Sequence, residues 1–138
     1  MTVVAIVDDS KPDRYTVKRR LSKGEEFDEV LEFEAGDKFL NDYFKPIRLD
    51  PNSHEELIVL MDINMPRMDG FETVAEMERQ LSEGNGVKSC VVMMFSSSDN
   101  PLDQERARQF NIVRGYIVKP FGIDDIKRLK ELASIGSS

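Results

Sequence analysis

Short apolar segments recur along the chain and are separated by longer stretches of mixed polarity. The first, third and fourth segments are continuous rather than alternating, which is typical of parallel strands that are covered on both faces. The sequence therefore predicts five β-strands, at residues 3–7, 30–33, 57–61, 90–95 and 116–118.

Apolar residues at helical spacing fill the stretches between these strands. Pro12 opens the first predicted helix, which ends at Gly24, and Asn100 with Pro101 supplies an N-cap and a first turn for the fourth. The second, third and last helices are defined by Phe39, Leu40 and Tyr43, by Phe71, Val74, Ala75, Met77 and Leu81 before the stop at residues 84–86, and by Ile123, Ile126, Leu129 and Ala133.

Strands that alternate with helices predict an α/β fold, a doubly wound parallel sheet with right-handed crossovers. We expect one domain over residues 1–138. Residues 45–56 contain Pro46 and Pro51 and are predicted to form an extended loop before the third strand, in which His54 is a solvated residue rather than a ligand.

Polar side chains follow four of the predicted strands. Asp8 and Asp9 follow the first strand, Asp62 the third, serines 96–98 the fourth, and Lys119 the fifth. Ligands of open α/β sheets bind at the carboxyl ends of the strands, so we expect these groups to converge. Close carboxylates raise each other's pKa unless a cation offsets the repulsion, and an oxygen-rich set of this kind suits Mg²⁺. The pattern predicts a magnesium-dependent phosphate site.

Composition narrows the class of protein further. The net charge of −7 disfavours a nucleic-acid-binding surface, and a single cysteine, Cys90, cannot form an internal disulfide, which favours the cytoplasm. The apolar runs are far too short to span a membrane, and no signal-peptide pattern precedes Val3.

Four segments together resemble the receiver domain of two-component response regulators, of the small chemotaxis-regulator type. They read "VVAIVDDS", "LIVLMDINMPRMDGFE", "VVMMFSSS" and "GYIVKPF", and the likeness runs from Val3 to about Leu132. The resemblance implies a flavodoxin-like five-stranded sheet with strand order 2-1-3-4-5 and five helices.

The same resemblance implies a role for each site residue. Asp62 is the phosphoacceptor, ionised at neutral pH, and Lys119 contacts the phosphoryl group. The implied ligands of Mg²⁺ are Asp9 directly, Asp8 through water, Asp62, and the backbone carbonyl of Asn64.

The remaining assignments concern the switch. Ser96 matches the switch hydroxyl, where threonine is commoner, and Tyr116 matches the switch aromatic residue. Pro120 is implied to follow a cis peptide bond.

The predicted function is a signalling domain rather than a conventional enzyme. A sensor histidine kinase or a histidine phosphotransfer protein is the implied donor of the phosphoryl group to Asp62. The output surface would be the fourth helix, fifth strand and fifth helix, with Arg106, Gln109, Tyr116, Lys127 and Lys130. A weak homodimer through this face is left open, as is whether the chain is a stand-alone regulator or part of a longer one.

Alternatives come from other classes of protein. The runner-up is a receiver that acts as a phosphate sink or shuttle in a phosphorelay without an output of its own. A haloacid-dehalogenase-type phosphatase needs a second acid two residues after the nucleophile, where this chain has Asn64. A flavodoxin-like FMN carrier is disfavoured because Asp8 and Asp9 would repel the phosphate of the flavin. A degenerate receiver used only for docking is disfavoured because the residues needed for phosphorylation are present here.

Overall fold

Five parallel strands form one sheet in the order β2-β1-β3-β4-β5, in a computed structural model that describes residues 1–24, 26–53, 55–84 and 87–136. The strands are β1 (Thr2–Val7), β2 (Glu29–Phe33), β3 (Glu55–Met61), β4 (Val87–Ser96) and β5 (Val113–Val118). The predicted fold class and strand order are confirmed, and every strand is longer than its apolar run alone suggests.

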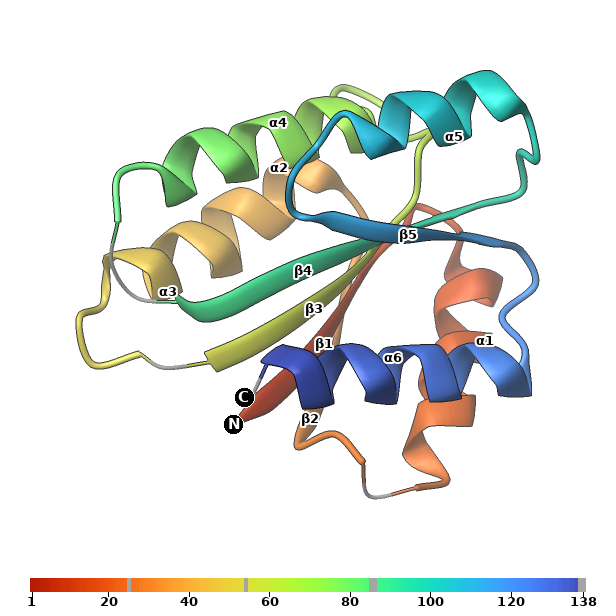
Figure 1. Ribbon diagram of the computed structural model, residues 1–138, viewed down its shortest axis with the longest axis horizontal. Helices are drawn as coiled ribbons and strands as arrows, with labels where there is room; N and C mark the ends of the chain where they lie inside the picture. The colour runs from red at the N-terminus through yellow and green to blue at the C-terminus, as the bar shows by residue number, and fades with distance from the viewer. Residues whose placement is uncertain (25, 54, 85–86, 137–138) are drawn as a thin grey trace.

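Helices cover both faces of the sheet (Figure 1). On one face lie α1 (Lys11–Ser22) and α6 (Ile123–Gly136). The other face carries a long helix in three segments, α2 (Gly36–Phe39), η1 (Leu40–Phe44) and α3 (Lys45–Leu49), together with α4 (Gly70–Leu81) and α5 (Pro101–Arg108). Of these described helices, none is both long and apolar enough to cross a membrane.

The sheet separates two apolar cores because its central strands are buried on both sides. Alternate residues of β1 point to opposite faces, so Val3 belongs to the same core as Phe71 of α4, whereas Val4 belongs to the core that includes Val17 of α1 and Leu129 of α6. This two-sided burial explains the continuous apolar runs in β1 and β3.

Residues 45–56 differ from the predicted loop at both ends. Residues 45–49 continue the second helix as α3, and Glu55 and Glu56 belong to β3. Pro46 suggested a break, but the π-helical segment η1 stands just before it, and such a wider turn accommodates the missing donor and the ring of a proline. His54 and the end of the stop signal, residues 85–86, lie outside the described residues.

Local capping sets the ends of the helices that border the site. Asp69 and Glu72 form a capping box at the start of α4, and the Asn100 side chain accepts a hydrogen bond from the Leu102 backbone N–H at the start of α5. In α6, Leu129 is buried as predicted, but Ile123 is 74% exposed because it begins the helix before the apolar face meets the sheet.

Gly70, the first residue of α4, lies against the backbone of Asp62. A Cβ at this position would stand 2.0 Å from the Asp62 carbonyl oxygen, and the Gly70 N–H donates to the Ile63 carbonyl at 2.8 Å. The start of α4 therefore supports the end of β3 from behind, with no space for a larger residue.

We predict that Gly70→Ala lowers the free energy of unfolding by about 2 kcal/mol, because the added methyl group collides with backbone rather than with a movable side chain. Urea denaturation measures the change. Gly122→Ala is the matched control, since its Cβ would meet only Asp125 Oδ2 at 3.6 Å. Equal stability of the two variants would contradict the proposed close packing.

Candidate functional site

Backbone hydrogen bonds extend the sheet by one residue at its carboxyl edge and so align the site. The Asp8 N–H donates to the Phe33 carbonyl at 3.0 Å, and the Asp62 N–H donates to the Val7 carbonyl at 2.9 Å. At the far strand, the Lys119 N–H donates to the Ser96 carbonyl at 2.8 Å. Groups that are up to 111 residues apart in the chain, from Asp8 to Lys119, thus meet at one edge.

Three carboxylates gather where β1 and β3 end. Oxygen atoms of Asp8, Asp9 and Asp62 all lie within 4.8 Å of one another. Asp8 is fully buried and Asp62 is 5% exposed, whereas Asp9 faces solvent. Two carboxylates of the cluster are therefore buried, and the third is open to solvent. Asn64, two residues after Asp62, is exposed in the following loop.

The Lys119 ammonium bridges this cluster. Its Nζ lies 2.8 Å from Asp8 Oδ2, 2.8 Å from Asp13 Oδ2 and 3.6 Å from Asp62 Oδ1. The Lys119–Pro120 peptide bond is cis. Burial opposes the charge of the lysine, but the hydrogen bond to Asp13 and the close contact with the Asp8 carboxylate raise its pKa above the ordinary value, so it is a cation at neutral pH.

Burial, followed by the charge of Asp8, raises the pKa of Asp62 to about 7 despite the nearby Lys119. In the metal-free site, Asp62 is therefore only partly ionised at neutral pH, contrary to the expectation from its unperturbed value. The charge of Asp8 acts in the direction predicted for close carboxylates, and the charge of Lys119 does not offset the combined effect of burial and Asp8.

The donor set fits a hard divalent cation. Asp8 Oδ2 is buried and accepts no hydrogen bond of good geometry from the described residues, although Lys119 Nζ is close. Two further carboxylates lie within reach, one of them open to water. An all-oxygen site with room for water is the environment that Mg²⁺ prefers.

A chain of hydrogen bonds connects Ser96 with Tyr116. Ser96 is 1% exposed, and its Oγ accepts from the Ser98 N–H at 3.1 Å. The Ser98 carbonyl accepts from the Tyr116 hydroxyl at 2.8 Å, while the Tyr116 ring is half-buried against the apolar core. Ser98 is thus the connection between the two residues, and its side chain also donates to Asp103 in α5 at 2.8 Å.

Sequence reasoning left Asp13 without a role, yet its carboxylate is a direct partner of Lys119. Asp13 lies in the first turn of α1, where the Ser10 side chain accepts from its N–H at 3.4 Å. Partial burial by itself would raise the pKa of Asp13, but the hydrogen bond from Lys119 has the opposite effect, and the pKa lies below its ordinary value. The only sequence signal was its position close behind Asp8 and Asp9.

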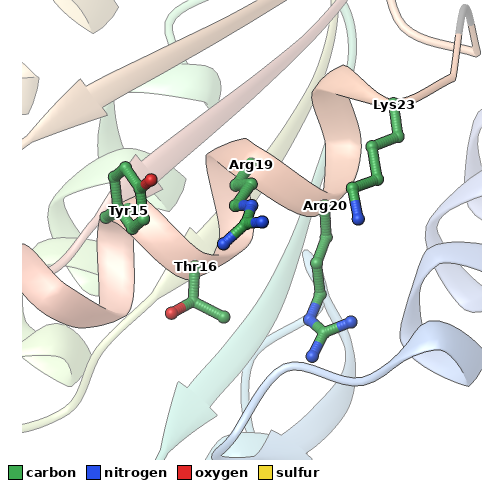
Figure 2. Close-up of a pocket in the computed structure, with 5 residues that line it drawn as sticks. All are labelled: Tyr15, Thr16, Arg19, Arg20 and Lys23. Atoms are coloured by element: carbon green, nitrogen blue, oxygen red, sulfur yellow. The ribbon is translucent and has the colours of Figure 1, made fainter.

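A second surface feature lies elsewhere on α1. A hollow of about 350 Å³ is lined, among the described residues, by Tyr15, Thr16, Arg19 and Arg20 of α1 and by Lys23, which directly follows the helix. Figure 2 shows these side chains. Three of these lining side chains are basic, whereas the candidate metal site is formed by carboxylates, so the hollow and the metal site are different places on the molecule.

Known proteins match the chain over half of its length or more. A sequence profile described as the response regulator receiver domain matches residues 4–131. PilG of Pseudomonas aeruginosa is 30% identical over 125 residues, which cover 89% of this chain and 80% of PilG. The probable methanogenesis regulatory protein FilR2 of Methanothrix harundinacea is 35% identical over 74 residues, 54% of this chain, and the match spans 44% of the length of FilR2.

A solved structure matches the fold. The crystal structure of a two component response regulator from Cytophaga hutchinsonii superposes with a TM-score of 0.79 at 21% sequence identity and covers 96% of both chains. At this identity the likeness supports the architecture alone.

The raised pKa of Asp62 predicts how stability changes with pH in the absence of metal. Between its ordinary value of 3.8 and about 7, the folded protein binds more protons than the unfolded chain, so the free energy of unfolding falls as pH rises through this window. We expect Asp62→Asn to stabilise the metal-free protein by about 2 kcal/mol at pH 8 and to have a negligible effect on this account at pH 4.

Urea denaturation in EDTA at the two pH values measures this difference. Repeating the measurement with Mg²⁺ is the control, because the cation should stabilise the wild type more than the variant. A variant that is less stable than the wild type at pH 8 in EDTA would contradict the charge repulsion.

Proposed function

The chain belongs to the response regulator receiver domain family, a family of signalling domains rather than conventional enzymes, and from this we propose that Asp62 accepts a phosphoryl group in a Mg²⁺-dependent reaction. The donor is a sensor histidine kinase or a histidine phosphotransfer protein, the kinds of protein with which this family interacts. The observation that carries the proposal is the position of Asp62 beside two other aspartates and within 3.6 Å of Lys119.

The proposed transfer exchanges one bond for another. A carboxylate oxygen of Asp62 attacks the phosphorus, the phosphorus–nitrogen bond of the donor phosphohistidine breaks, and the imidazole leaves with the electron pair. Attack of water on the resulting acyl phosphate returns the carboxylate and inorganic phosphate. Both steps require in-line positioning and charge neutralisation more than acid–base chemistry.

The neighbours of Asp62 have separate proposed roles. Lys119 pairs with a phosphoryl oxygen through its ammonium group. Asp8, Asp9, Asp62 and the backbone carbonyl of Asn64 are the proposed ligands of Mg²⁺, which when bound supplies positive charge against the carboxylates and the incoming phosphoryl oxygens. A cation at this point also favours the ionised, nucleophilic form of Asp62.

The proposed switch runs through the β4–α5 loop. The Ser96 hydroxyl donates to a phosphoryl oxygen in the phosphorylated state and, as it turns inward, gives up its contact with the Ser98 N–H. The Tyr116 hydroxyl donates a hydrogen bond to the Ser98 carbonyl, so a shift of Ser98 changes the position of the tyrosine ring. One charge-assisted hydrogen bond is worth roughly 1.5–3 kcal/mol, enough to bias a two-state loop but not to rearrange the core.

The proposed output surface is the face of α5, β5 and α6. A hollow of about 360 Å³ lies on this face, lined among others by Gln104, Ala107 and Tyr116. Two of the basic residues expected here have partners elsewhere, since Arg106 lies over the Phe71 ring at 4.4 Å and Lys130 pairs with Glu26 at 3.1 Å. The hollow beside Tyr116, rather than these two cations, is the feature of this face that supports the proposed output surface.

Residues 1–138 act in this proposal as a single cytoplasmic receiver domain, with the downstream protein unidentified and a weak homodimer as one form of output. A phosphate sink or shuttle in a phosphorelay is the second candidate, because the same site would serve it without an output surface. A change at the Tyr116 face on phosphorylation separates the two.

We expect incubation with acetyl phosphate and Mg²⁺ to add one phosphoryl mass to the intact protein, removable by hydroxylamine. Mass spectrometry should find no addition to Asp62→Asn and almost none to the wild type in EDTA. A full addition to Asp62→Asn, or a full addition without a divalent cation, would refute the assignment of the phosphoacceptor.

Ser96→Ala should still take up the phosphoryl group on Asp62 but should lose most of the response around residues 100–110 and at Tyr116. Amide NMR spectra before and after phosphorylation measure the response. Ser97→Ala is the control, since Ser97 is exposed and adjacent in the chain. If Ser96→Ala retains the complete wild-type response, the hydroxyl of Ser96 is not the switch.

A further inference from the structure

Lys119 is shared in the resting site between a buried carboxylate and one at the rim. Its Nζ is 2.8 Å from Asp8 Oδ2 and 2.8 Å from Asp13 Oδ2. The distance to Asp62 Oδ1 is 3.6 Å, beyond the length of a good charge-assisted hydrogen bond. The lysine is therefore close to the proposed phosphoacceptor but held by other partners.

A phosphoryl group on Asp62 can gain a strong contact with Lys119 only if the ammonium moves toward it. One of the two existing contacts must then lengthen. The Asp13 side chain is 37% exposed and can be hydrated when the lysine leaves, whereas the Asp8 side chain is 0% exposed and depends on a charged partner. Asp13 is the partner that costs less to release.

Asp13 is placed for this role by α1 and not by the sheet. It stands in the first turn of the helix, where the Ser10 cap holds its backbone, and it lies 106 residues from Lys119 in the chain. The Asp13 carboxylate therefore stays in place when the lysine moves and can pair with the lysine again. An ordinary acidic residue of a helix first turn would face solvent and would not contact the site.

We propose that Asp13 is a positioning residue that competes with the phosphoryl group for the Lys119 ammonium and so limits how readily Asp62 takes up and keeps that group. The inference rests on the proposed function. It adds Asp13, a residue of α1, to the residues already proposed to take part. In the resting protein the Asp13–Lys119 pair is closed, and in the phosphorylated protein it is open.

The test uses beryllofluoride with saturating Mg²⁺ as a stable analogue of the phosphoryl group. Asp13→Asn removes the charge but keeps the shape, and it should bind the analogue about five-fold more tightly than the wild type, the size expected from loss of a partly exposed ion pair. Asp13→Ser should behave in the same way. Thermal unfolding establishes that each variant is folded.

Two controls separate this role from others. Asp99→Asn removes an exposed acidic charge from the β4–α5 loop and should change the affinity little; equal tightening in both variants would reduce the effect to general electrostatics. If Asp13 merely anchors Lys119 in a useful position, Asp13→Asn should instead weaken binding, and this result would overturn the proposal.

A second readout follows the lysine itself. The NMR signal of the Lys119 ammonium should differ between wild type and Asp13→Asn in the free proteins and coincide in their beryllofluoride complexes, where Asp13 no longer holds it. A difference that persists in the complexes would contradict the competition. Failure of the wild type to bind the analogue would refute the proposed function as well, whereas equal binding by wild type and Asp13→Asn would refute the role of Asp13 alone.

Discussion

Negative charge concentrated at the carboxyl edge of a buried sheet is the constraint on which the site depends. Asp8 and Asp62 are almost wholly removed from water, and burial, followed by the charge of Asp8, raises the pKa of Asp62 to about 7 even with Lys119 nearby. A site of this kind is stable enough to fold but incompletely neutralised. It therefore has an intrinsic affinity for added positive charge and a sensitivity to any change in the charge at Asp62.

The parallel sheet is what allows such a concentration to exist. β1 and β3 pair in register up to Val7 and Met61, so the two aspartates that follow them emerge side by side. Apolar residues cover both faces below this edge, and they supply the stability against which the repulsion is set. Pairing of β4 with β5 likewise brings Ser96 and Lys119 to this edge, so that the Asp62 carboxylate, the Lys119 ammonium and the Ser96 hydroxyl belong to one sheet.

Much of this arrangement could be predicted from the sequence because it follows from periodicity and strand ends. The continuous runs in β1 and β3 indicate two-sided burial, and the residues after each strand indicate the site. Pro46 misled the prediction because a π-helical segment, which has no simple sequence signal, allows the helix to continue. The partners of Lys119 and Lys130 could not be predicted either, since which carboxylate a long side chain reaches depends on tertiary distances.

The close contact between Gly70 and the Asp62 backbone makes the two sides of the site unequal: the α4 side is tightly packed, and the side toward the loop after β4 is more open. The first residue of α4 packs so closely against the Asp62 backbone that a Cβ at Gly70 would have no space, which limits movement of the end of β3 toward this helix. Toward β4, the neighbours are Ser96 and a loop whose residues 97, 99 and 100 are exposed and have few packing constraints. The structural response to the proposed phosphorylation of Asp62 is therefore expected on the β4 side of the site, at Ser96 and the loop that follows it, rather than evenly around Asp62.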